Sequence, residues 1–446
     1  MGKYFGTDGV RGVANEDLTC EFAMKLGRAA AAVLAAHKGT KPTVLIGKDT
    51  RISGDMLEGA LTAGLCSVGV DVVSLGVVPT PAVAYLVKKY GADAGVMISA
   101  SHNPFEYNGI KIFNGEGFKL ADAIEEEIEY LLDSRSEIVM KYGDELGKVT
   151  VSKTAVSDYI DHILMTVDTE MTGIKVALDC ACGSASVTAK ELFTRLGAEV
   201  VVKSNTYNGT DINDGCGSTH MESLQKLVVE EGCDIGLAFD GDADRCLAVD
   251  ENGCLIDGDK MIAIFAKELK SKNELKNDTA VVTVMSNMGF FKFAKENGIN
   301  TSITAVGDRY VLEEMLKEGY GIGGEQSGHI IFLQHATTGD GQLSGAQLLQ
   351  VMAHTGKKAS ELASVMQVFP QVLKNLKVPN DQKGVVSHPE VQRVIKEFEE
   401  QLGDTGRILV RASGTEPLVR VMLEGENLDV ISDIADKIVD VIKENM

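Results

Sequence analysis

Three carboxylates alternate with small residues in the segment Asp240-Gly241-Asp242-Ala243-Asp244-Arg245. Carboxylates two positions apart in a tight loop can converge on one point, as they do in the first half of a calcium-binding loop. Without a cation this convergence is costly, because two carboxylates about 4 Å apart repel by roughly 4 kcal/mol at an effective dielectric constant of 20. Three oxygen ligands that leave room for water and a phosphate oxygen favour Mg²⁺. The alternative interpretation is an exposed acidic turn.

Ser101 is the next residue whose surroundings in the sequence predict a chemical role. It lies in Ser99-Ala100-Ser101-His102-Asn103-Pro104, directly after the apolar run 94–98. The run predicts a short buried strand, and the Asn-Pro pair marks a loop. Because loops at strand ends are held at a crevice of the sheet, the Ser101 hydroxyl could be presented to a ligand. The alternative is a serine and asparagine turn that only satisfies the backbone.

A third pattern is suited to anions. Arg411 and Arg420 flank Ser413-Gly414-Thr415. Successive N–H groups in a turn that contains glycine form an anion-binding nest, and guanidinium groups bind phosphate through two hydrogen bonds. The alternative is a hairpin turn with arginines at its rim. Near the N-terminus, Arg11 lies in the glycine-rich run 6–12, which is a weak signal by itself.

Glu325 and Ser327 lie among Gly323, Gly324 and Gly328, a pattern typical of a carbohydrate site. Carboxylates and small hydroxyls hydrogen-bond sugar hydroxyls or an amine, and glycines let the ligand approach the backbone. Two further residues remain ambiguous at this point. His329 is either a core histidine or a functional one, and Lys111 is either a surface lysine or a proton-transfer group.

The elements that must position these residues follow one pattern three times. Short apolar strands alternate with segments whose apolar residues recur at the spacing of a helix. This alternation predicts three similar mixed α/β domains with largely parallel sheets. Each unit ends a strand in an unusual polar loop. The tail differs, because strands at 408–411 and 418–423 and a final amphipathic helix predict a smaller C-terminal α+β domain. The expected domains are 1–155, 156–256, 257–369 and 370–446.

Composition restricts the class of function. The chain has 446 residues, 44% of them hydrophobic, and a formal charge of −22. This charge argues against nucleic acid and anionic membranes as partners, so an anionic substrate needs a local cluster of Arg and Lys. The N-terminal residues carry no apolar signal core, and no apolar run is long enough to span a bilayer. We expect a cytoplasmic protein whose eight scattered cysteines are reduced thiols.

With these loops assembled, the sequence resembles the α-D-phosphohexomutase superfamily over essentially its whole length. Four motifs occur in the order of that family: 99–104, 240–245, 324–329 and 411–417. Within the superfamily, the runs 5–12 and 216–220 and Gln326 are similar to the bacterial branch that acts on glucosamine phosphates.

The resemblance implies four domains around a central active-site cleft, and it implies roles for the residues named above. It implies a phosphorylated Ser101 in the active form, and one Mg²⁺ held by Ser101, Asp240, Asp242 and Asp244. It implies that Glu325 and Ser327 bind the sugar, and that Arg411, Ser413, Gly414, Thr415 and Arg420 bind its non-reacting phosphate. Lys111 is the first candidate for the general acid or base, with His329 and Arg11 as helpers, and Arg245 and His102 are expected to neutralise charge in the transition state.

The expected reaction interconverts glucosamine 6-phosphate and glucosamine 1-phosphate through a bound glucosamine 1,6-bisphosphate, and would supply amino-sugar nucleotide synthesis for cell walls. A glucosamine or glucose 1,6-bisphosphate is the expected primer, and the resemblance suggests a homodimer. Three alternatives stay open. They are a sister mutase for mannose and glucose phosphates, a phosphatase that uses the same serine and metal, and a non-catalytic sugar-phosphate sensor.

Overall fold

The computed structural model describes residues 2–6, 8–34, 41–134, 138–413 and 417–446. These residues form two compact units. The first consists of residues 1–285 and 299–365, and the second of residues 286–298 and 366–446. Among the described helices, none combines the length and the apolar composition that a bilayer crossing requires.

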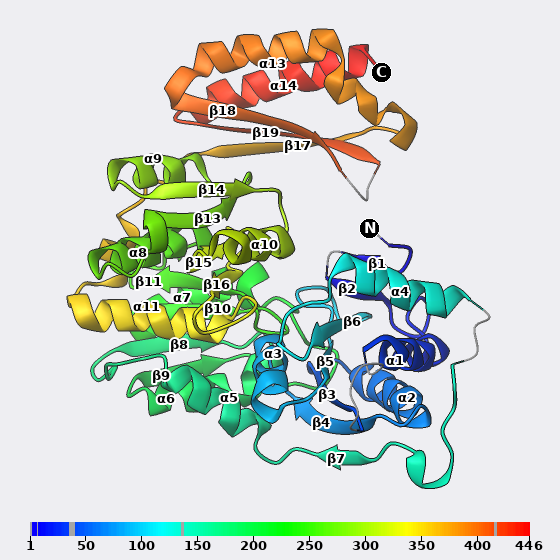
Figure 1. Ribbon diagram of the computed structural model, residues 1–446. Helices are drawn as coiled ribbons and strands as arrows, with labels where there is room; N and C mark the ends of the chain where they lie inside the picture. The colour runs from blue at the N-terminus through cyan, green and yellow to red at the C-terminus, as the bar shows by residue number, and fades with distance from the viewer. Residues whose placement is uncertain (1, 7, 35–40, 135–137, 414–416) are drawn as a thin grey trace. The chain divides into compact units, whose positions relative to one another are not determined.

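A seven-stranded sheet organises the N-terminal part of the first unit (Figure 1). Its strand order is β1-β2-β6-β5-β3-β4-β7. The strands β5, β3, β4 and β7 run parallel to their neighbours, whereas β6 pairs antiparallel with β5 and β2. The strand bounds are β1 Phe5–Gly6, β2 Gly9–Val13, β3 Thr43–Lys48, β4 Asp71–Val77, β5 Ala94–Ile98, β6 Tyr107–Asn114 and β7 Val149–Val151.

Helices cover both faces of this sheet. One face packs on α1, α2 and α4 in a continuous apolar core that includes Leu26, Leu61 and Ile128. The other face packs on α3, whose Val83 and Val87 lie against Gly47 and Gly95, where no side chain intervenes. The helix bounds are α1 Cys20–Leu34, α2 Gly54–Ser67, α3 Thr80–Tyr90 and α4 Asp122–Asp133, and the 3₁₀-helix η1 is Gly143–Glu145.

The second sheet of this unit has five strands in the order β12-β11-β10-β8-β9. Strands β9, β8 and β10 are parallel, and β11 returns antiparallel to β10. Its elements are α5 Ala155–Leu164, β8 Lys175–Asp179, η2 Ser184–Val187, α6 Ala189–Arg195, β9 Glu199–Lys203, η3 Gly217–Thr219, α7 Glu222–Glu231, β10 Ile235–Phe239, β11 Cys246–Asp250 and β12 Leu255–Ile256.

The third sheet has four strands in the order β14-β13-β15-β16, with β16 antiparallel to β15. The buried helices α8 and α11 carry apolar residues along most of their length, which is typical of helices enclosed by protein. The elements are α8 Gly258–Ser271, η4 Lys276–Asp278, β13 Thr279–Thr283, β14 Asn300–Thr304, α10 Asp308–Glu318, β15 Ile322–Gly324, β16 Ile330–Phe332, α11 Gly341–Thr355 and α12 Ala359–Ala363.

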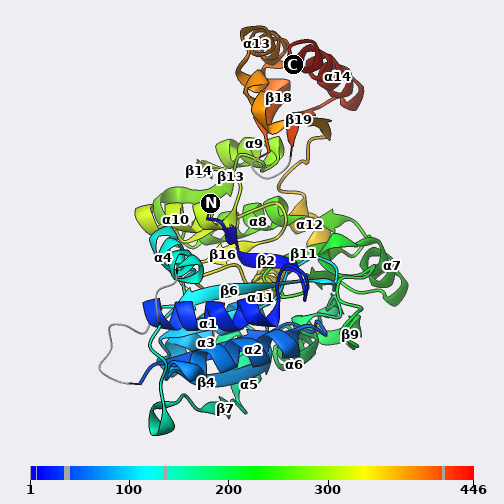
Figure 2. The ribbon, with the colours of Figure 1, turned by 90° about the vertical axis from the view of Figure 1, so that its right-hand side faces the viewer.

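The second unit has a three-stranded antiparallel sheet of order β17-β19-β18. Helices α13 and α14 lie side by side on one face of it (Figures 1 and 2). Helix α9 belongs to this unit although it lies between β13 and β14 in the sequence. The elements are α9 Met288–Glu296, β17 Gln371–Lys377, η5 Asn380–Ser387, α13 Pro389–Leu402, η6 Gly403–Thr405, β18 Gly406–Ala412, β19 Leu418–Gly425 and α14 Leu428–Glu444.

The predicted fold class, mixed α/β domains followed by a smaller α+β domain, is confirmed. The structure shows one feature of the connections between strands that the sequence pattern did not reveal. Each predicted functional loop joins a strand to an antiparallel return strand: β5 to β6, β10 to β11, β15 to β16, and β18 to β19. The returning strands β6, β11 and β16 were not predicted. β11 and β16 are short apolar runs directly after polar loops, and β6 alternates apolar residues with polar ones such as Lys111.

Candidate active site

Ser101 is held at the tip of the β5–β6 loop in a left-handed backbone conformation, with φ of 52°. Its side chain is buried, and its Oγ donates a hydrogen bond of 2.6 Å to Oδ2 of Asp240. The Ser101 N–H donates to Oγ of Ser99 at 2.9 Å. A non-glycine residue at positive φ is uncommon, so the surrounding contacts must fix this conformation. The hydroxyl therefore faces the carboxylate loop, and the role of Ser101 toward a ligand stays a prediction.

The β10–β11 loop places the three predicted carboxylates in one buried cluster. One oxygen each from Asp240, Asp242 and Asp244 lies within 4.8 Å of the others. The Oδ1 atoms of Asp242 and Asp244 are buried and accept no hydrogen bond from any described group. Buried carboxylate oxygens without partners are costly unless a cation neutralises them. The donor set is all oxygen, as Mg²⁺ prefers, so this cluster fits a magnesium ion. The alternative of an exposed acidic turn is wrong.

The pKa values in the cluster diverge for electrostatic reasons. Burial, together with the charges of Asp244 and Asp242, raises the pKa of Asp240 to about 8. Burial acts on Asp244 in the same direction, but Lys111 and His329 outweigh it and lower the pKa of Asp244 below its usual range. Like charges that share a site separate their pKa values in this way.

Lys111 lies on β6, opposite Met97 of β5, and only 1% of its side chain is exposed. Its Nζ lies 2.8 Å from Oδ2 of Asp8, 2.8 Å from Oδ2 of Asp242 and 3.5 Å from Oδ2 of Asp244. Burial disfavours its charge, but Asp242 and Asp8 outweigh this effect and raise its pKa well above the ordinary value. The surface-lysine interpretation is therefore wrong, and Lys111 is a buried cation beside the carboxylate cluster.

His329 is also buried, on the loop between β15 and β16. Its Nδ1 lies 3.7 Å from Oδ2 of Asp244, and its Nε2 accepts a hydrogen bond of 3.0 Å from the N–H of Gly339. In the neutral ring this leaves the proton on Nδ1, facing Asp244. The Nε2 atom also lies 3.5 Å from Oδ2 of Asp308, at the start of α10. Lys119 in turn bridges Asp308 and Asp8.

Three more predicted residues gather beside Ser101. The Nη1 atom of Arg245 lies 3.2 Å from Nδ1 of His102, and its Nε lies 3.9 Å from Oδ1 of Asp244. Burial, Arg245 and Arg11 lower the pKa of His102 to about 4, so its ring is neutral at pH 7 and accepts from Arg245. Arg11 lies on β2 and donates to Oδ2 of Asp8 at 3.2 Å. His102 therefore orients a cation and carries no charge of its own.

The β15–β16 loop presents the predicted sugar-binding residues. Glu325 is half-buried and its Oε1 accepts from the N–H of Gly307 at 3.0 Å, whereas Ser327 is exposed. Gly328 has φ of +91°, and a Cβ there would lie 2.2 Å from the carbonyl oxygen of Cys246. This glycine is therefore required, because it lets the loop rest on the strand that follows the carboxylates.

The predicted phosphate-binding residues lie in the second unit. Arg411 and Arg420 are paired residues of β18 and β19 and are directly opposite each other. Burial and the charge of Arg420 lower the pKa of Arg411. Like charges directly opposite in a sheet are destabilising, which fits a site for an anion. Ser413 is buried and its carbonyl accepts from Nζ of Lys383 at 2.6 Å. Gly414 and Thr415 lie outside the described residues.

Sequence reasoning missed the residues that hold the Ser101 loop. Arg51 is buried, ion-paired with Asp49, and donates to the carbonyl oxygens of Ser101 and Asn103 at 2.8 Å each. The amide of Asn213 donates to the same two carbonyls at 2.9 and 3.1 Å. One signal was present, since Arg51 lies in a polar loop directly after a strand, as do the predicted loops.

Thr80 and the Asp8–Lys119–Asp308 bridge were also missed. The Thr80 hydroxyl, at the start of α3, donates to Oδ2 of Asp242 at 2.6 Å. Nothing in the sequence around Thr80 or Lys119 distinguishes these residues from ordinary helix or loop positions.

Comparison with known proteins places this geometry in a family. Four family models match consecutive parts of the chain: phosphoglucomutase/phosphomannomutase alpha/beta/alpha domain I over residues 2–138, domain II over 157–253, domain III over 257–369, and the C-terminal domain over 373–441. The chain belongs to the phosphoglucomutase/phosphomannomutase family, and the predicted superfamily is confirmed.

Within this family, the chain is similar over its full length to relatives named phosphoglucosamine mutase. The chain is 56% identical to the phosphoglucosamine mutase of Acetivibrio thermocellus, with 100% of both chains covered. It is 56% identical to the phosphoglucosamine mutase of Clostridium novyi, covering 100% of this chain and 99% of the relative. A solved structure of a phosphoglucomutase/phosphomannomutase family protein from Burkholderia thailandensis is 25% identical, covers 100% of this chain and 98% of that one, and superposes with a TM-score of 0.81.

Proposed function

We propose that the protein is an isomerase, a phosphoglucosamine mutase that interconverts glucosamine 6-phosphate and glucosamine 1-phosphate. The observation that carries this proposal is the Ser101 hydroxyl, 2.6 Å from Asp240 in a buried three-carboxylate cluster that is flanked by a buried lysine. Relatives named phosphoglucosamine mutase that match over the full length support the amino-sugar substrate.

In the proposed reaction Ser101 carries a phosphoryl group. O1 of glucosamine 6-phosphate attacks its phosphorus, the bond to Ser101 Oγ breaks, and the O1 proton passes to a protein group. The resulting glucosamine 1,6-bisphosphate turns over within the site. Ser101 Oγ then attacks the phosphorus at position 6, the bond to O6 breaks, a protein group returns the proton to O6, and glucosamine 1-phosphate leaves. Catalysis of this kind depends on positioning and charge stabilisation.

We assign the magnesium ligands to Asp240, Asp242, Asp244 and an oxygen of phosphorylated Ser101. When bound, the ion would neutralise charge on the transferring phosphoryl group. The surrounding side chains keep the carboxylates in place. Thr80 fixes Oδ2 of Asp242, and the backbone N–H of Arg245 donates to Oδ1 of Asp240 at 3.2 Å.

Proton transfer is assigned first to Lys111, with His329 and Arg11 as helpers. Lys111 is within 3.5 Å of two carboxylates of the cluster, and His329 contacts one of them. A proton-transfer group must lie within hydrogen-bond reach of the reacting oxygen, or reach it through one water. Arg245 stabilises charge on the transferring group, and His102 orients Arg245 through the contact at 3.2 Å.

We assign sugar binding to Glu325 and Ser327, and binding of the non-reacting phosphate to Arg411, Ser413, Gly414, Thr415 and Arg420. The repulsion between the opposed Arg411 and Arg420 is relieved when an anion lies between their guanidinium groups. Because the nest must accept either isomer, it binds the distant phosphate while the reacting end changes.

The remaining sequence predictions stand as part of the proposal. They are domains at 1–155, 156–256, 257–369 and 370–446, a glucosamine or glucose 1,6-bisphosphate that first phosphorylates Ser101, a homodimer, and a cytoplasmic enzyme that supplies cell-wall precursors.

A coupled assay for glucosamine 1-phosphate formed from glucosamine 6-phosphate with Mg²⁺ tests the proposal. The wild type is compared with Ser101→Ala and with Ser157→Ala, an exposed serine on α5 that bonds only the carbonyl of Thr154. We expect robust turnover in the wild type and Ser157→Ala, and collapse in Ser101→Ala.

Three results would contradict this assignment. Turnover on glucose or mannose phosphates without turnover on glucosamine 6-phosphate would favour a phosphoglucomutase/phosphomannomutase. Inorganic phosphate released at the rate of substrate loss would favour a phosphatase. Full activity of Ser101→Ala would remove the phosphoserine from the mechanism.

A further inference from the structure

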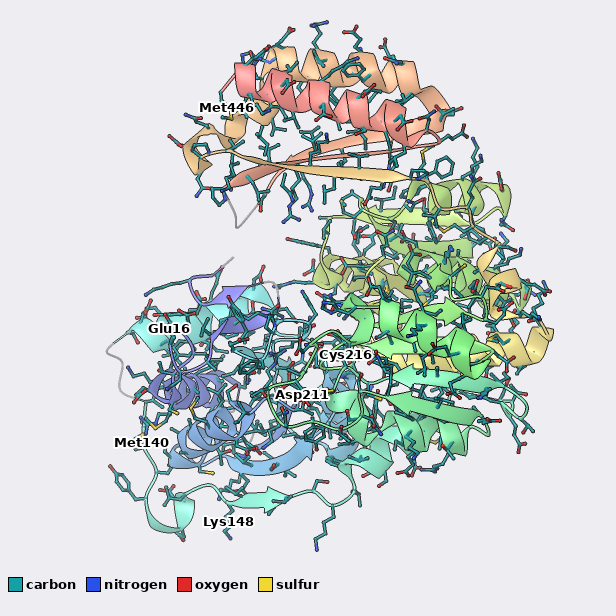
Figure 3. The ribbon with its side chains drawn as sticks, turned by 180° about the vertical axis from the view of Figure 1, so that it is seen from behind. Glu16, Met140, Lys148, Asp211, Cys216 and Met446 are labelled. Carbon is teal, nitrogen blue, oxygen red and sulfur yellow. The ribbon has the colours of Figure 1, made fainter. Side chains whose placement is uncertain are left out.

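Two thiols that are distant in sequence meet beside the active site. Cys182 follows β8, and Cys216 lies at the end of the long segment between β9 and α7, where Figure 3 labels it together with Asp211. The two thiols lie close enough for each to shift the pKa of the other. Both cysteines are free, with Cys182 half-buried and Cys216 buried. The pair has no part in the proposed mutase reaction.

The backbone around this pair is closely fitted. Ala181 and Cys182 both have positive φ, of 55° and 49°, which is unusual for consecutive non-glycine residues. A Cβ at Gly217 would lie 2.6 Å from Cβ of Ala181, so the two segments pack with no side chain between them. The N–H of Asn213 also donates to the carbonyl of Ala181 at 2.9 Å. These contacts hold the neighbouring Cys182 and Cys216 together.

The same two segments support the active-site loops. Asn213, three residues before Cys216, donates its side-chain amide to the carbonyls of Ser101 and Asn103. On the other segment, the N–H of Ser184 donates to the carbonyl of Gly241 at 2.8 Å, inside the carboxylate loop. A change in the separation of the two cysteines therefore acts on the serine loop and on the carboxylate loop.

We propose that Cys182 and Cys216 are a modification site: a hydroperoxide oxidises them to a disulfide, which displaces the segment carrying Asn213 and slows the enzyme reversibly. A disulfide requires a sulfur–sulfur bond of about 2 Å, which is shorter than any contact between two unbonded sulfurs, so we expect the two segments to move closer when the bond forms.

The chemistry balances with the peroxide as the oxidant. The neighbouring Cys182 thiol lowers the pKa of the Cys216 thiol, so Cys216 is the residue that attacks as thiolate. Its sulfur attacks one peroxide oxygen, the O–O bond breaks, and a sulfenic acid and hydroxide form. The proton that Cys216 lost on forming the thiolate neutralises this hydroxide. The Cys182 sulfur then attacks the Cys216 sulfur, the S–O bond breaks, and the departing hydroxide takes the Cys182 proton and leaves as water. Two thiols and one peroxide give one disulfide and two waters.

Full-length protein, first reduced and then treated with hydrogen peroxide, tests the site. Thiols are counted under denaturing conditions and the linked peptides are identified by mass spectrometry. We expect the count to fall by two from eight, with Cys182 and Cys216 in one cross-linked peptide pair. Cys182→Ser and Cys216→Ser should each abolish the link, and Cys182→Ala and Cys216→Ala serve as replacements if a serine variant fails to fold. Cys254→Ser, which removes an exposed thiol, should leave it intact.

Mutase activity is measured on the same samples. Of the two measurements, only this one rests on the proposed function. We expect oxidation to lower turnover by about tenfold, because small displacements of catalytic groups have large effects on rate. A reducing agent should restore the activity, and Cys182→Ser should not respond to peroxide.

Three results would overturn the proposal: Cys182 and Cys216 staying reduced while Cys254 reacts, Cys216 pairing with Cys180 instead, or a disulfide forming with no loss of turnover. An enzyme inactive on glucosamine 6-phosphate would contradict only the proposed function, since the mass measurement still decides whether the disulfide forms.

Discussion

The guanidinium of Arg51 donates a hydrogen bond of 2.8 Å to the carbonyl oxygen of Ser101. Arg51 lies in the loop that follows β3, and its side chain also bonds the carbonyls of Asn103, Pro104 and Tyr107. One buried cation thus satisfies four carbonyl groups of the serine loop. The left-handed conformation of Ser101 is maintained by a neighbouring strand end, which explains how a strained residue can hold a reactive hydroxyl in place.

Replacing Arg51 should therefore damage both stability and activity. Arg51→Ala leaves the buried carboxylate of Asp49 without its partner, which typically costs about 3–5 kcal/mol. We expect a clear fall in Tm by circular dichroism and a loss of turnover. Arg393→Ala is the control, because this arginine is exposed on α13 and its pairs with Glu390 and Glu397 are at the surface. Equal effects of the two substitutions would contradict the role of Arg51.

Thr80→Val tests whether the hydrogen bond from Thr80 to Asp242 supports the proposed metal site. Valine keeps the shape of threonine but removes the donor to Oδ2 of Asp242. Substitutions of such supporting partners typically weaken metal binding by about 10–100-fold. We expect the Mg²⁺ concentration for half-maximal activity to rise by about that factor while Tm without metal changes little. An unchanged Mg²⁺ requirement would show that Thr80 only begins α3.

Metal removal should destabilise the wild type more than it destabilises Asp240→Asn. A chelator should abolish wild-type activity and lower its Tm, because the buried carboxylates then repel one another. Because the pKa of metal-free Asp240 is about 8, asparagine at position 240 removes one of these charges only above that pH. At pH 9 the metal-free variant should therefore be more stable than the metal-free wild type. Added Mg²⁺ should raise Tm in the wild type and have little effect on the variant. Thermal shift measurements with and without Mg²⁺ decide the point.

The raised pKa of Glu125, on α4, predicts that the stability of the protein depends on pH. Burial raises its pKa to about 7, despite the opposing charge of Arg309. Asp122, Glu129 and Lys119 also face it. Because the folded state favours the protonated form, Glu125 destabilises the protein as pH rises from about 4.5 to 7.

The matching measurement compares Glu125→Gln with the wild type across this range. We expect similar Tm values near pH 4 and a higher Tm for the variant at pH 8. Glu126→Gln, at an exposed neighbouring position, should give no such trend. A constant difference at every pH would mean that packing, and not titration, distinguishes glutamate from glutamine at position 125.

The opposed arginines predict a response to phosphate. Arg411 and Arg420 repel each other across β18 and β19 unless an anion lies between them. Inorganic phosphate should raise the Tm of the wild type but not that of the variant with Arg411→Gln and Arg420→Gln. The same variant should raise KM for the sugar phosphate more than it lowers kcat, because it acts on binding of the distant phosphate. An equal phosphate response in both proteins would contradict the anion site.

Much of the fold and part of the site could be predicted because strand ends have a recognisable signature. The apolar runs before Ser101 and Asp240 are short and end in polar residues, so both the strands and their loops were identified. The return strands were missed, and with them the burial of Lys111, since the alternating run around it is equally typical of a half-exposed edge strand.

The contacts that Lys119 and Arg51 make at the candidate active site could not be predicted from one sequence. Lys119 meets Asp8 and Asp308 only because two different sheets place their loop ends together. Arg51 lies in a polar loop of ordinary composition, and the four carbonyls that it satisfies depend on the tertiary path of the serine loop. Side-chain convergence between separate elements leaves no local pattern in the chain.

The position of α9 has a consequence for how genes of this kind can be rearranged. This helix is encoded between two strands of the first unit, yet Asn287 and Met288 bond Phe369 and Glu424 of the second. A stop codon at position 366 would leave α9 translated without these partners, and would also remove the contacts of Phe291 with Arg407 and of Lys292 with Phe369. The C-terminal segment therefore cannot be lost or exchanged as a simple cassette, and recombination that preserves the fold must carry residues 286–298 with it.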